Sequence, residues 1–327
     1  MVLAGAVASV SGARPSVEYR AALYAVRGDG SGDHLLVEPD PPVSAFVRSP
    51  GGQSILFSKD IDGVSALFAA DRSGANAVRL TPPDLPADGT GAFSPDGRWI
   101  AFSTAVSCGF RCFHANLYVV RRDGGDLRLI AENAAVPSWA PDSRRLVYGG
   151  SRGTYGPALG IFVTDTVSDQ TTQVARGSVN WPVWAPRGER IAYWANKSGY
   201  GVACFVNADG SRRRCTHGHS LTSLVWSPDA RYVAFRQANP HRLGIVDSNA
   251  RHVRSLGDYG DEARPAVWSP DRQRLVYYDA GHSQINVLRV AAPGRVLRVV
   301  NKPVSFLSDV RWRAGGITYV AARPVAP

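Results

Sequence analysis

Hydrophobic runs and short polar turns alternate in one recurring order along almost the whole chain. At residues 93–98 an aromatic residue is followed by Ser-Pro-Asp-Gly-Arg, and residues 99–102 then read Trp-Ile-Ala-Phe. Related phrases lie at residues 139–148, 184–193, 226–235 and 268–277, and weaker copies begin at residues 48 and 312. Pro, Asp and Gly suit successive positions of a tight turn, while Ile, Val, Phe and Tyr favour strands. Each phrase therefore predicts two strands joined by a tight turn.

A second pair of hydrophobic runs follows each phrase. Residues 117–120 and 127–130 lie on either side of an Asp-Gly-Gly turn, and residues 203–206 and 212–215 flank an Asp-Gly turn. Such a pair is typical of a hairpin with a short connection. We therefore expect four strands in each repeat, named A to D from the centre outward, and no long helix.

The spacing of the copies indicates the architecture. The prolines of the first six copies are Pro50, Pro95, Pro141, Pro186, Pro228 and Pro270, and Ala314 stands at this place in the seventh. Successive copies are thus 42 to 46 residues apart. Internal repeats of about 40–45 residues are typical of the four-stranded blades of a β-propeller. The sequence predicts an all-β, seven-bladed β-propeller of antiparallel blades, with six blades as the alternative.

The last repeat has only two strands, from about residue 306 to residue 322. The missing pair is present at the other end of the chain, where residues 21–26 and 34–37 flank a Gly-Asp-Gly turn. We expect this N-terminal hairpin to lie outermost beside the C-terminal strands, because closure of the ring removes an open sheet edge. Residues 20–322 would then form one domain, and residues 323–327 a tail.

The repeated phrase, aromatic-Ser-Pro-Asp-Gly before a strand, resembles the WD40-like propeller repeat of the TolB-like family. The resemblance covers roughly residues 20–322. It implies a propeller that serves as a binding platform or as an accessory domain of a peptidase. The seven copies differ from the six-bladed propeller of the family's namesake, so the resemblance does not imply a direct role in the Tol–Pal system.

The N-terminus and the overall composition bear on where the protein resides. No stretch approaches the 18 apolar residues of a membrane span, so none is expected. Residues 1–19 read as an apolar leader or the remnant of a signal peptide. The Ala-Val-Ala at residues 6–8 resembles a cleavage site, although a positively charged segment before it is missing.

Four cysteines form two local pairs. Cys204 and Cys215 each lie five positions from the Asp-Gly turn at residues 209–210, so a two-residue hairpin would place them opposite each other, close enough for a disulfide. Two buried thiols are the alternative. Cys108 and Cys112 favour a loop disulfide over a metal site with His114, because the spacing is not a zinc pattern. Two disulfides predict an extracytoplasmic protein that is periplasmic, secreted or envelope-associated, with the cytoplasm as the alternative.

The net charge of +10 comes almost wholly from arginine, since the chain has only three lysines. We expect many of these arginines on outer strands, where charge protects sheet edges from pairing with other chains. The sharpest cluster, at residues 212–214, has no adjacent aromatic run, so nucleic acid is a disfavoured partner. A protein or peptide partner and a monomeric state are expected. The arginines placed on outer strands are Arg79, Arg128, Arg212, Arg213, Arg214, Arg254 and Arg298.

The connections between strands fall into two kinds. The A–B and C–D turns are short, whereas the B–C and D–A connections vary in length and chemistry, and the two kinds emerge on opposite faces of a propeller. Because function on rigid scaffolds sits in variable loops, we expect any site on the B–C/D–A face. The candidate interaction residues there are Asp84, Asp88, Arg152, Tyr155, Tyr200, His217, His219, Asp258, Tyr259, Asp261 and Glu262.

Sharper chemical motifs are weak. Residues 149–153 match Gly-x-Ser-x-Gly, but that elbow needs a helix after the serine and a strand is expected. The His-Gly-His at residues 217–219 could supply two metal ligands, and residues 60–63 match a calcium loop only faintly. We therefore predict a non-catalytic binding module without a cofactor, for a protein, peptide or envelope ligand. The alternative is a metal-dependent lactonase or lyase with Asp62, Asp84, His217, Asp258, Asp261 and Glu262 at the channel mouth.

Overall fold

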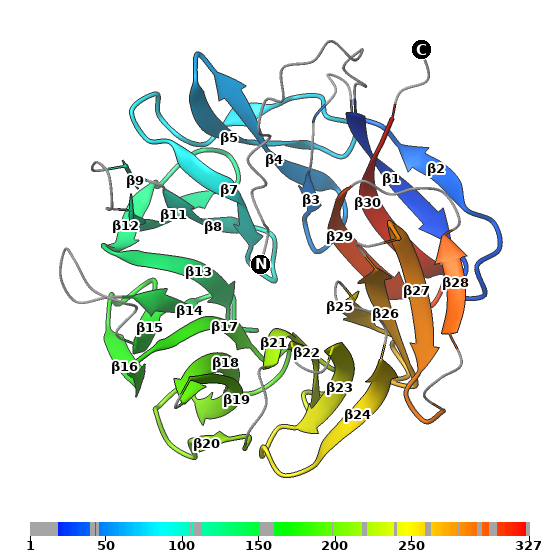
Figure 1. The fold of residues 1–327 in the computed structure, drawn as a ribbon. Helices are drawn as coiled ribbons and strands as arrows, with labels where there is room; N and C mark the ends of the chain where they lie inside the picture. Colours follow the sequence, from blue (N-terminus) through cyan, green and yellow to red (C-terminus); the bar gives the residue numbers. More distant parts are fainter. Residues whose placement is uncertain are drawn as a thin grey trace, which may run out of the picture.

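The computed structural model contains strands and no helix in the part of the chain that it describes. Seven four-stranded antiparallel sheets are arranged in a ring, which confirms the predicted seven-bladed propeller (Figure 1). Among these residues no helix is long and apolar enough to cross a membrane. The structure describes residues 19–39, 43, 46–104, 106–107, 113–150, 160–197, 199–217, 221–238, 241–258, 263–279, 282–292, 296–300 and 306–324.

The first four blades follow the order of the chain, and in each the A strand is innermost. Blade 1 consists of β3 (Val47–Arg48), β4 (Ser54–Ile61), β5 (Val64–Asp71) and β6 (Val78–Arg79). Blade 2 consists of β7 (Ala87–Phe93), β8 (Trp99–Thr104), β11 (Leu117–Arg121) and β12 (Arg128–Ala131). Blade 3 consists of β13 (Ala134–Trp139), β14 (Arg145–Gly150), β15 (Gly160–Asp165) and β16 (Thr171–Arg176). Blade 4 consists of β17 (Val179–Trp184), β18 (Arg190–Lys197), β19 (Tyr200–Asn207) and β20 (Arg214–Cys215).

The ring continues through two further blades and closes on a blade built from both ends of the chain. Blade 5 consists of β21 (Leu221–Trp226), β22 (Tyr232–Ala238), β23 (His241–Asp247) and β24 (Val253–Asp258). Blade 6 consists of β25 (Ala263–Trp268), β26 (Arg274–Asp279), β27 (Gln284–Arg289) and β28 (Val296–Val300). Blade 7 has the order β2 (His34–Val37), β1 (Tyr19–Val26), β30 (Gly316–Pro324) and β29 (Phe306–Arg313), so the N-terminal hairpin is outermost as predicted.

The repeated Ser-Pro-Asp phrase has a structural role that uses its polar atoms. In blade 2, Ser94 Oγ accepts the backbone N–H of Trp99 at 3.0 Å and donates to Asp96 Oδ1 at 2.5 Å. Asp96 Oδ1 also accepts the backbone N–H of Arg98 at 3.0 Å. Ser227 with Asp229 and Ser269 with Asp271 make the same contacts in blades 5 and 6. The phrase recurs because it fixes the A–B turn, which agrees with the preference of Asp and Ser for local backbone bonds.

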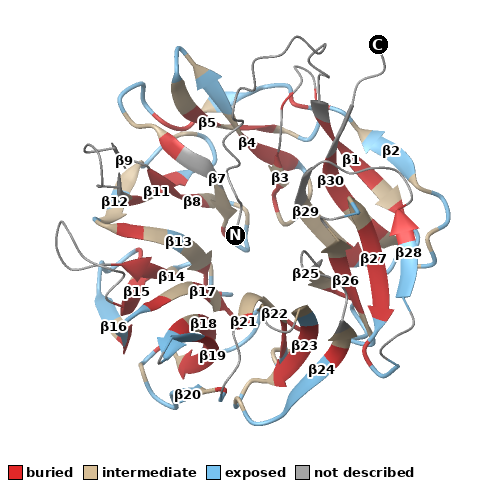
Figure 2. Cartoon of the chain, viewed as in Figure 1, coloured by how far each residue is buried: buried red, intermediate tan, exposed pale blue. Residues whose placement is uncertain are grey.

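The hydrophobic core is divided among the blade interfaces. Among the described residues it forms seven clusters, one between each pair of neighbouring blades. Between blades 3 and 4, for example, Val147 and Ile161 pack against Ile191 and Tyr193, all fully buried. The outermost strands β2 and β24 are mostly exposed, whereas the middle strands are buried (Figure 2). The ring therefore owes its stability to contacts between blades.

Arginine bridges every one of these seven interfaces. A guanidinium is suited to this because its planar fork donates to several acceptors at fixed angles, which lysine cannot do. Arg128 and Arg254, expected only to protect sheet edges, also donate to backbone carbonyls of the next blade. In ring order the contacts are Arg122 to Ser54, Arg128 to Thr166, Arg145 to Glu189, Arg190 to Ser248, Arg254 to Val290, Arg274 over the Trp312 ring, and Arg311 to Ser49.

One turn carboxylate gives the fold a pH dependence. Arg144 Nε lies 2.7 Å from Asp165 Oδ2, and the backbone N–H groups of Val167 and Ser168 donate to Oδ1. The hydrogen bond from Arg144 is the main cause that lowers the pKa of Asp165 from 3.8 to about 2. Because the folded pKa lies below the unfolded one, this stabilisation is complete above about pH 4 and is lost as the pH falls toward 2.

Replacement of Asp165 with asparagine is therefore expected to lower the thermal midpoint at pH 5. The midpoint of the variant should also decrease less than that of the wild type between pH 4 and 2. Melting curves recorded across this range would measure the effect. Asp169→Asn, an exposed change in the same turn, is the control and should leave the curve parallel to the wild type. If the midpoint of Asp165→Asn falls between pH 4 and 2 as steeply as that of the wild type, Asp165 is not the source of this pH dependence.

Candidate functional site

The two faces of the ring differ in what their connections do. The A–B and C–D turns lie on one face, here called the turn face, because every A strand runs toward it and every B strand leaves it. The B–C and D–A connections lie on the other, here called the loop face. The connection between β8 and β11 on the loop face is long enough to include a small hairpin of β9 (Val106–Ser107) and β10 (Phe113–His114). The rigid turns and the variable loops are thus separated by the length of the blades.

An open depression of about 590 Å³ lies on the turn face, between blades 1 and 2. Two of its three arginines, Arg121 and Arg122, already have partners within the protein. Arg122 Nη1 donates to Ser54 Oγ at 2.7 Å, and the Arg121 guanidinium lies 3.3 Å from Asp123 Oδ2 and 3.6 Å from Asp126 Oδ2. These contacts hold the turns, and we assign no ligand to the depression.

The candidate loop residues that the structure describes come from separate blades. Asp84 is exposed in the connection that leads into β7, and Asp88 lies within β7. Tyr200 begins β19 and is 61% exposed, while His217 is exposed just before β21. Asp258 is the last residue of β24. Arg152, Tyr155, His219, Tyr259, Asp261 and Glu262 lie outside the described residues.

The groups considered for metal or nucleophilic chemistry have other roles where they are described. Asp60 Oδ1 accepts the backbone N–H of Gly63 at 2.9 Å, and Asp62 has a φ of 55°, so this segment forms the tight turn between β4 and β5. Gly149 and Gly150 end β14, and the chain next enters strand β15, so the Gly-x-Ser-x-Gly string joins two strands. Across the described ranges, no three His, Cys, Asp or Glu side chains are grouped so that they could hold a metal ion.

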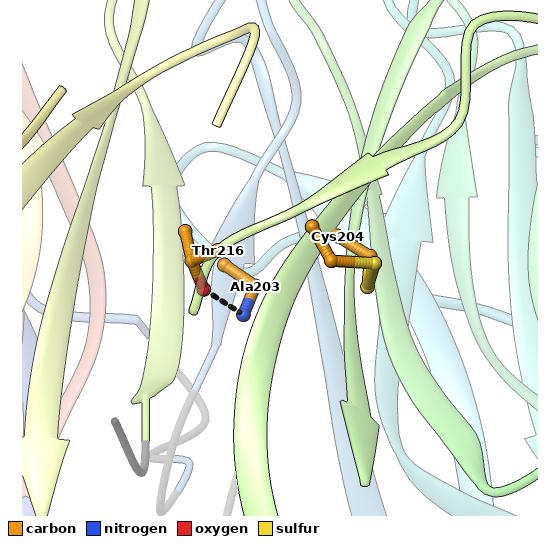
Figure 3. The surroundings of a disulfide bond; sticks show 4 residues. Ala203, Cys204 and Thr216 are labelled. Atoms are coloured by element: carbon orange, nitrogen blue, oxygen red, sulfur yellow. Dashed lines mark hydrogen bonds between the residues drawn. A yellow bond between two sulfur atoms is a disulfide. The ribbon is translucent and has the colours of Figure 1, made fainter. Parts of the chain in front are cut away.

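The disulfide predicted in blade 4 is confirmed. Cys204 in β19 and Cys215 in β20 are opposite each other, with their Cα atoms 4.0 Å apart, and their sulfur atoms are bonded (Figure 3). Beside the bond, Thr216 Oγ1 accepts the backbone N–H of Ala203 at 3.2 Å. The disulfide fixes the point at which the chain leaves β20 for the loop face. Cys108 and Cys112, the other predicted pair, lie outside the described residues.

A pair of tryptophans on the loop-face half of blade 4 was missed by the sequence analysis. Trp181 in β17 and Trp194 in β18 are both half-buried, and their rings contact each other. The repeat's own tryptophans are structural, since Trp139, Trp226 and Trp268 each donate an indole N–H to the neighbouring blade. Trp181 and Trp194 fall outside the repeated phrase, and this departure was the signal that could have identified them.

Comparisons with known proteins agree with the architecture. No protein-family model matches the chain, and no curated protein matches it significantly. TolB from Acinetobacter baumannii is similar in structure with a TM-score of 0.50 and 17% identity, over 84% of this chain and 65% of that one. An oligogalacturonate lyase from Vibrio parahaemolyticus gives a TM-score of 0.62 at 15% identity, over 93% of this chain and 97% of that one.

The fold also occurs as part of a larger enzyme. Puromycin hydrolase matches with a TM-score of 0.53 and 17% identity, over 72% of this chain and 42% of the hydrolase. At these identities the likeness concerns the fold alone, and the similar structures include TolB as well as two enzymes. The chain has the fold of the TolB-like β-propellers.

Proposed function

We propose that this protein is a non-catalytic binding module whose loop face contacts a protein or peptide. The observation that supports the proposal is that the side chains on the two faces have different roles. On the turn face, the serines, aspartates and arginines of the repeat hold turns and neighbouring blades together. On the loop face, Trp181, Trp194 and Tyr200 are additional to the repeat and reach solvent. Aromatic residues of this kind are enriched at protein interfaces.

We further propose that the protein works outside the cytoplasm. The Cys204–Cys215 bond closes a C–D hairpin whose D strand has only two residues. Disulfides persist in oxidising compartments and are rare in the cytosol. The partner is therefore expected among periplasmic, secreted or envelope components.

Capture of a partner from envelope extracts tests this function. The variant Asp258→Lys, Asp261→Lys and Glu262→Lys reverses the charge of one loop-face segment, and we expect it to reduce capture by roughly tenfold if that loop forms part of the contact. The control reverses three exposed acids of the turn face, Asp123, Asp126 and Asp169, and so changes the net charge equally. Capture reduced by the control alone would contradict a loop-face contact. Equal capture by all three proteins would exclude the 258–262 segment as the contact.

A further inference from the structure

Trp181 is placed by an irregularity that recurs in the innermost strands. In β17 the pairing shifts between Asn180 and Val183, so the strand carries one more residue than its partner over this stretch, which is a β-bulge. Trp181 has a φ of 50°, and the corresponding residues of blades 3 and 5, Val136 and Ser223, have values of 58° and 55°. The bulge thus accepts a small side chain in a neighbouring blade. The fold does not require a tryptophan at this position.

Trp194 completes the pair from the next strand. The two ring centroids lie 5.5 Å apart and the ring planes are inclined by 58°, so the rings pack against each other as a tilted pair, here called the wedge. A Cβ atom on Gly201, in β19, would lie only 2.1 Å from Trp194 Nε1. Because glycine has no side chain, the Trp194 indole can occupy this space over β19. The wedge lies where β17, the innermost strand of blade 4, meets β18 (Figure 1).

The wedge offers hydrogen-bond donors and no charge. Neither indole N–H donates to a described residue, and both tryptophans are partly exposed. Trp194 pairs with Asn180 of β17 and with Ala203 of β19, and Asn180 Oδ1 already accepts the backbone N–H of Trp181 at 2.8 Å. A saccharide would find few partners here for its hydroxyl groups. Although the protein has a net charge of +10, the two tryptophans carry no charge. They therefore favour an uncharged, compact ring with carbonyl acceptors beside it.

We propose that the Trp181–Trp194 wedge binds a proline ring of an extended, proline-rich peptide segment, with an indole N–H donating to a peptide carbonyl. The polyproline II helix has no internal hydrogen bonds, so its carbonyl groups are free, and it docks on aromatic-lined grooves with little loss of conformational entropy. This inference rests on the proposed binding function and names the partner's chemistry at one point of the loop face.

A fluorescently labelled peptide of ten prolines tests the proposal by anisotropy titration, with a Gly-Ser peptide of the same length as the reference. Trp181→Ser places in blade 4 the residue type that blade 5 carries at its bulge, and Gly201→Ala retains both indoles but displaces Trp194. Each change is expected to weaken binding of the proline peptide by roughly tenfold or more, as for an aromatic anchor. Tyr232→Ser, which removes an exposed aromatic side chain of the turn face, is the matched control and should leave the affinity within about twofold.

Indole N–H resonances provide a second readout that a merely structural role would not change. On addition of the proline peptide, those of Trp181 and Trp194 should shift, whereas those of the bonded Trp139, Trp226 and Trp268 should not. Absence of saturable binding to the wild-type protein, or binding unaffected by Trp181→Ser and Gly201→Ala, would overturn the proposal. If the wild-type protein still captures an envelope partner in that case, only this inference fails. If it captures no partner at all, the proposed function fails as well.

Discussion

Replacement of Asp309 with alanine is expected to lower the free energy of unfolding by about 3–5 kcal/mol, the largest effect of any single substitution considered. Asp309 lies in β29 of blade 7, and Arg48 lies in β3 of blade 1. The Arg48 Nε donates to Asp309 Oδ2 at 2.7 Å, and the two side chains are only 7% and 10% exposed. Arg311 Nε donates to Oδ1 at 3.2 Å. We call these three residues the ring-closure clasp.

The size of the effect follows from what the substitution leaves behind. Without the carboxylate, the buried Arg48 guanidinium keeps only a bond from Nη1 to Thr318 Oγ1 at 2.9 Å, and its charge is uncompensated. Arg311 retains backbone carbonyl acceptors at Ser49 and Pro50, but burial already lowers its pKa. Breaking one partner of a buried ion pair costs more than replacing both with apolar groups. Arg48→Met with Asp309→Leu should therefore recover part of the lost stability, since Arg311 still lacks its carboxylate partner.

Urea unfolding of the single and double variants measures this prediction. Glu132→Ala, which removes an exposed carboxylate between β12 and β13, serves as the control and should change the free energy by less than about 0.5 kcal/mol. A loss below about 1 kcal/mol in Asp309→Ala, close to the range of exposed pairs, would show that the clasp does not hold the ring closed.

Removal of the disulfide is the second large change. The double variant Cys204→Ala/Cys215→Ala is expected to lose about 2–3 kcal/mol, because the bond closes a short loop, with a sequence separation of 11, and restricts the unfolded chain. Cys204 is fully buried, so alanine was chosen to avoid burying a new hydroxyl. Unfolding in urea with and without a reductant provides the measurement.

The reductant separates the bond from the packing of the two side chains. It should shift the wild-type midpoint toward that of the double variant and shift the double variant less, because only the predicted Cys108–Cys112 bond could be reduced there. A wild-type midpoint that does not move although thiol titration shows reduced cysteines would contradict a stabilising disulfide.

The fold could be predicted from the sequence because its determinants are local. The A–B turns of blades 2, 5 and 6 are each fixed within six residues by side-chain bonds such as those of Ser94 and Asp96, so the complete phrase marks the turn wherever it occurs. The Cys204–Cys215 pair was predictable for the same reason, since both lie at equal distance from one tight turn. Ring closure followed from counting strands at the two ends of the chain.

The clasp and the tryptophan wedge could not be predicted in this way. Arg48 and Asp309 are 261 positions apart and lie in the two weakest copies of the repeat, where the Ser-Pro-Asp-Gly phrase is incomplete. The contact between Trp181 and Trp194 depends on the bulge in β17, and a one-residue bulge leaves no mark in an alternating pattern. Six of the eleven candidate loop residues lie outside the described residues, so their part in a site stays a prediction.

Photo-cross-linking at two matched tyrosines tests the central claim, that partners bind the loop face. Tyr200 begins β19 on the loop face and is 61% exposed, while Tyr232 begins β22 beside a turn of the turn face and is 40% exposed. A photoreactive phenylalanine analogue would replace one or the other, and each protein would be irradiated with envelope extract. We predict a discrete adduct from position 200 and none from position 232. An adduct from position 232 alone would contradict the account.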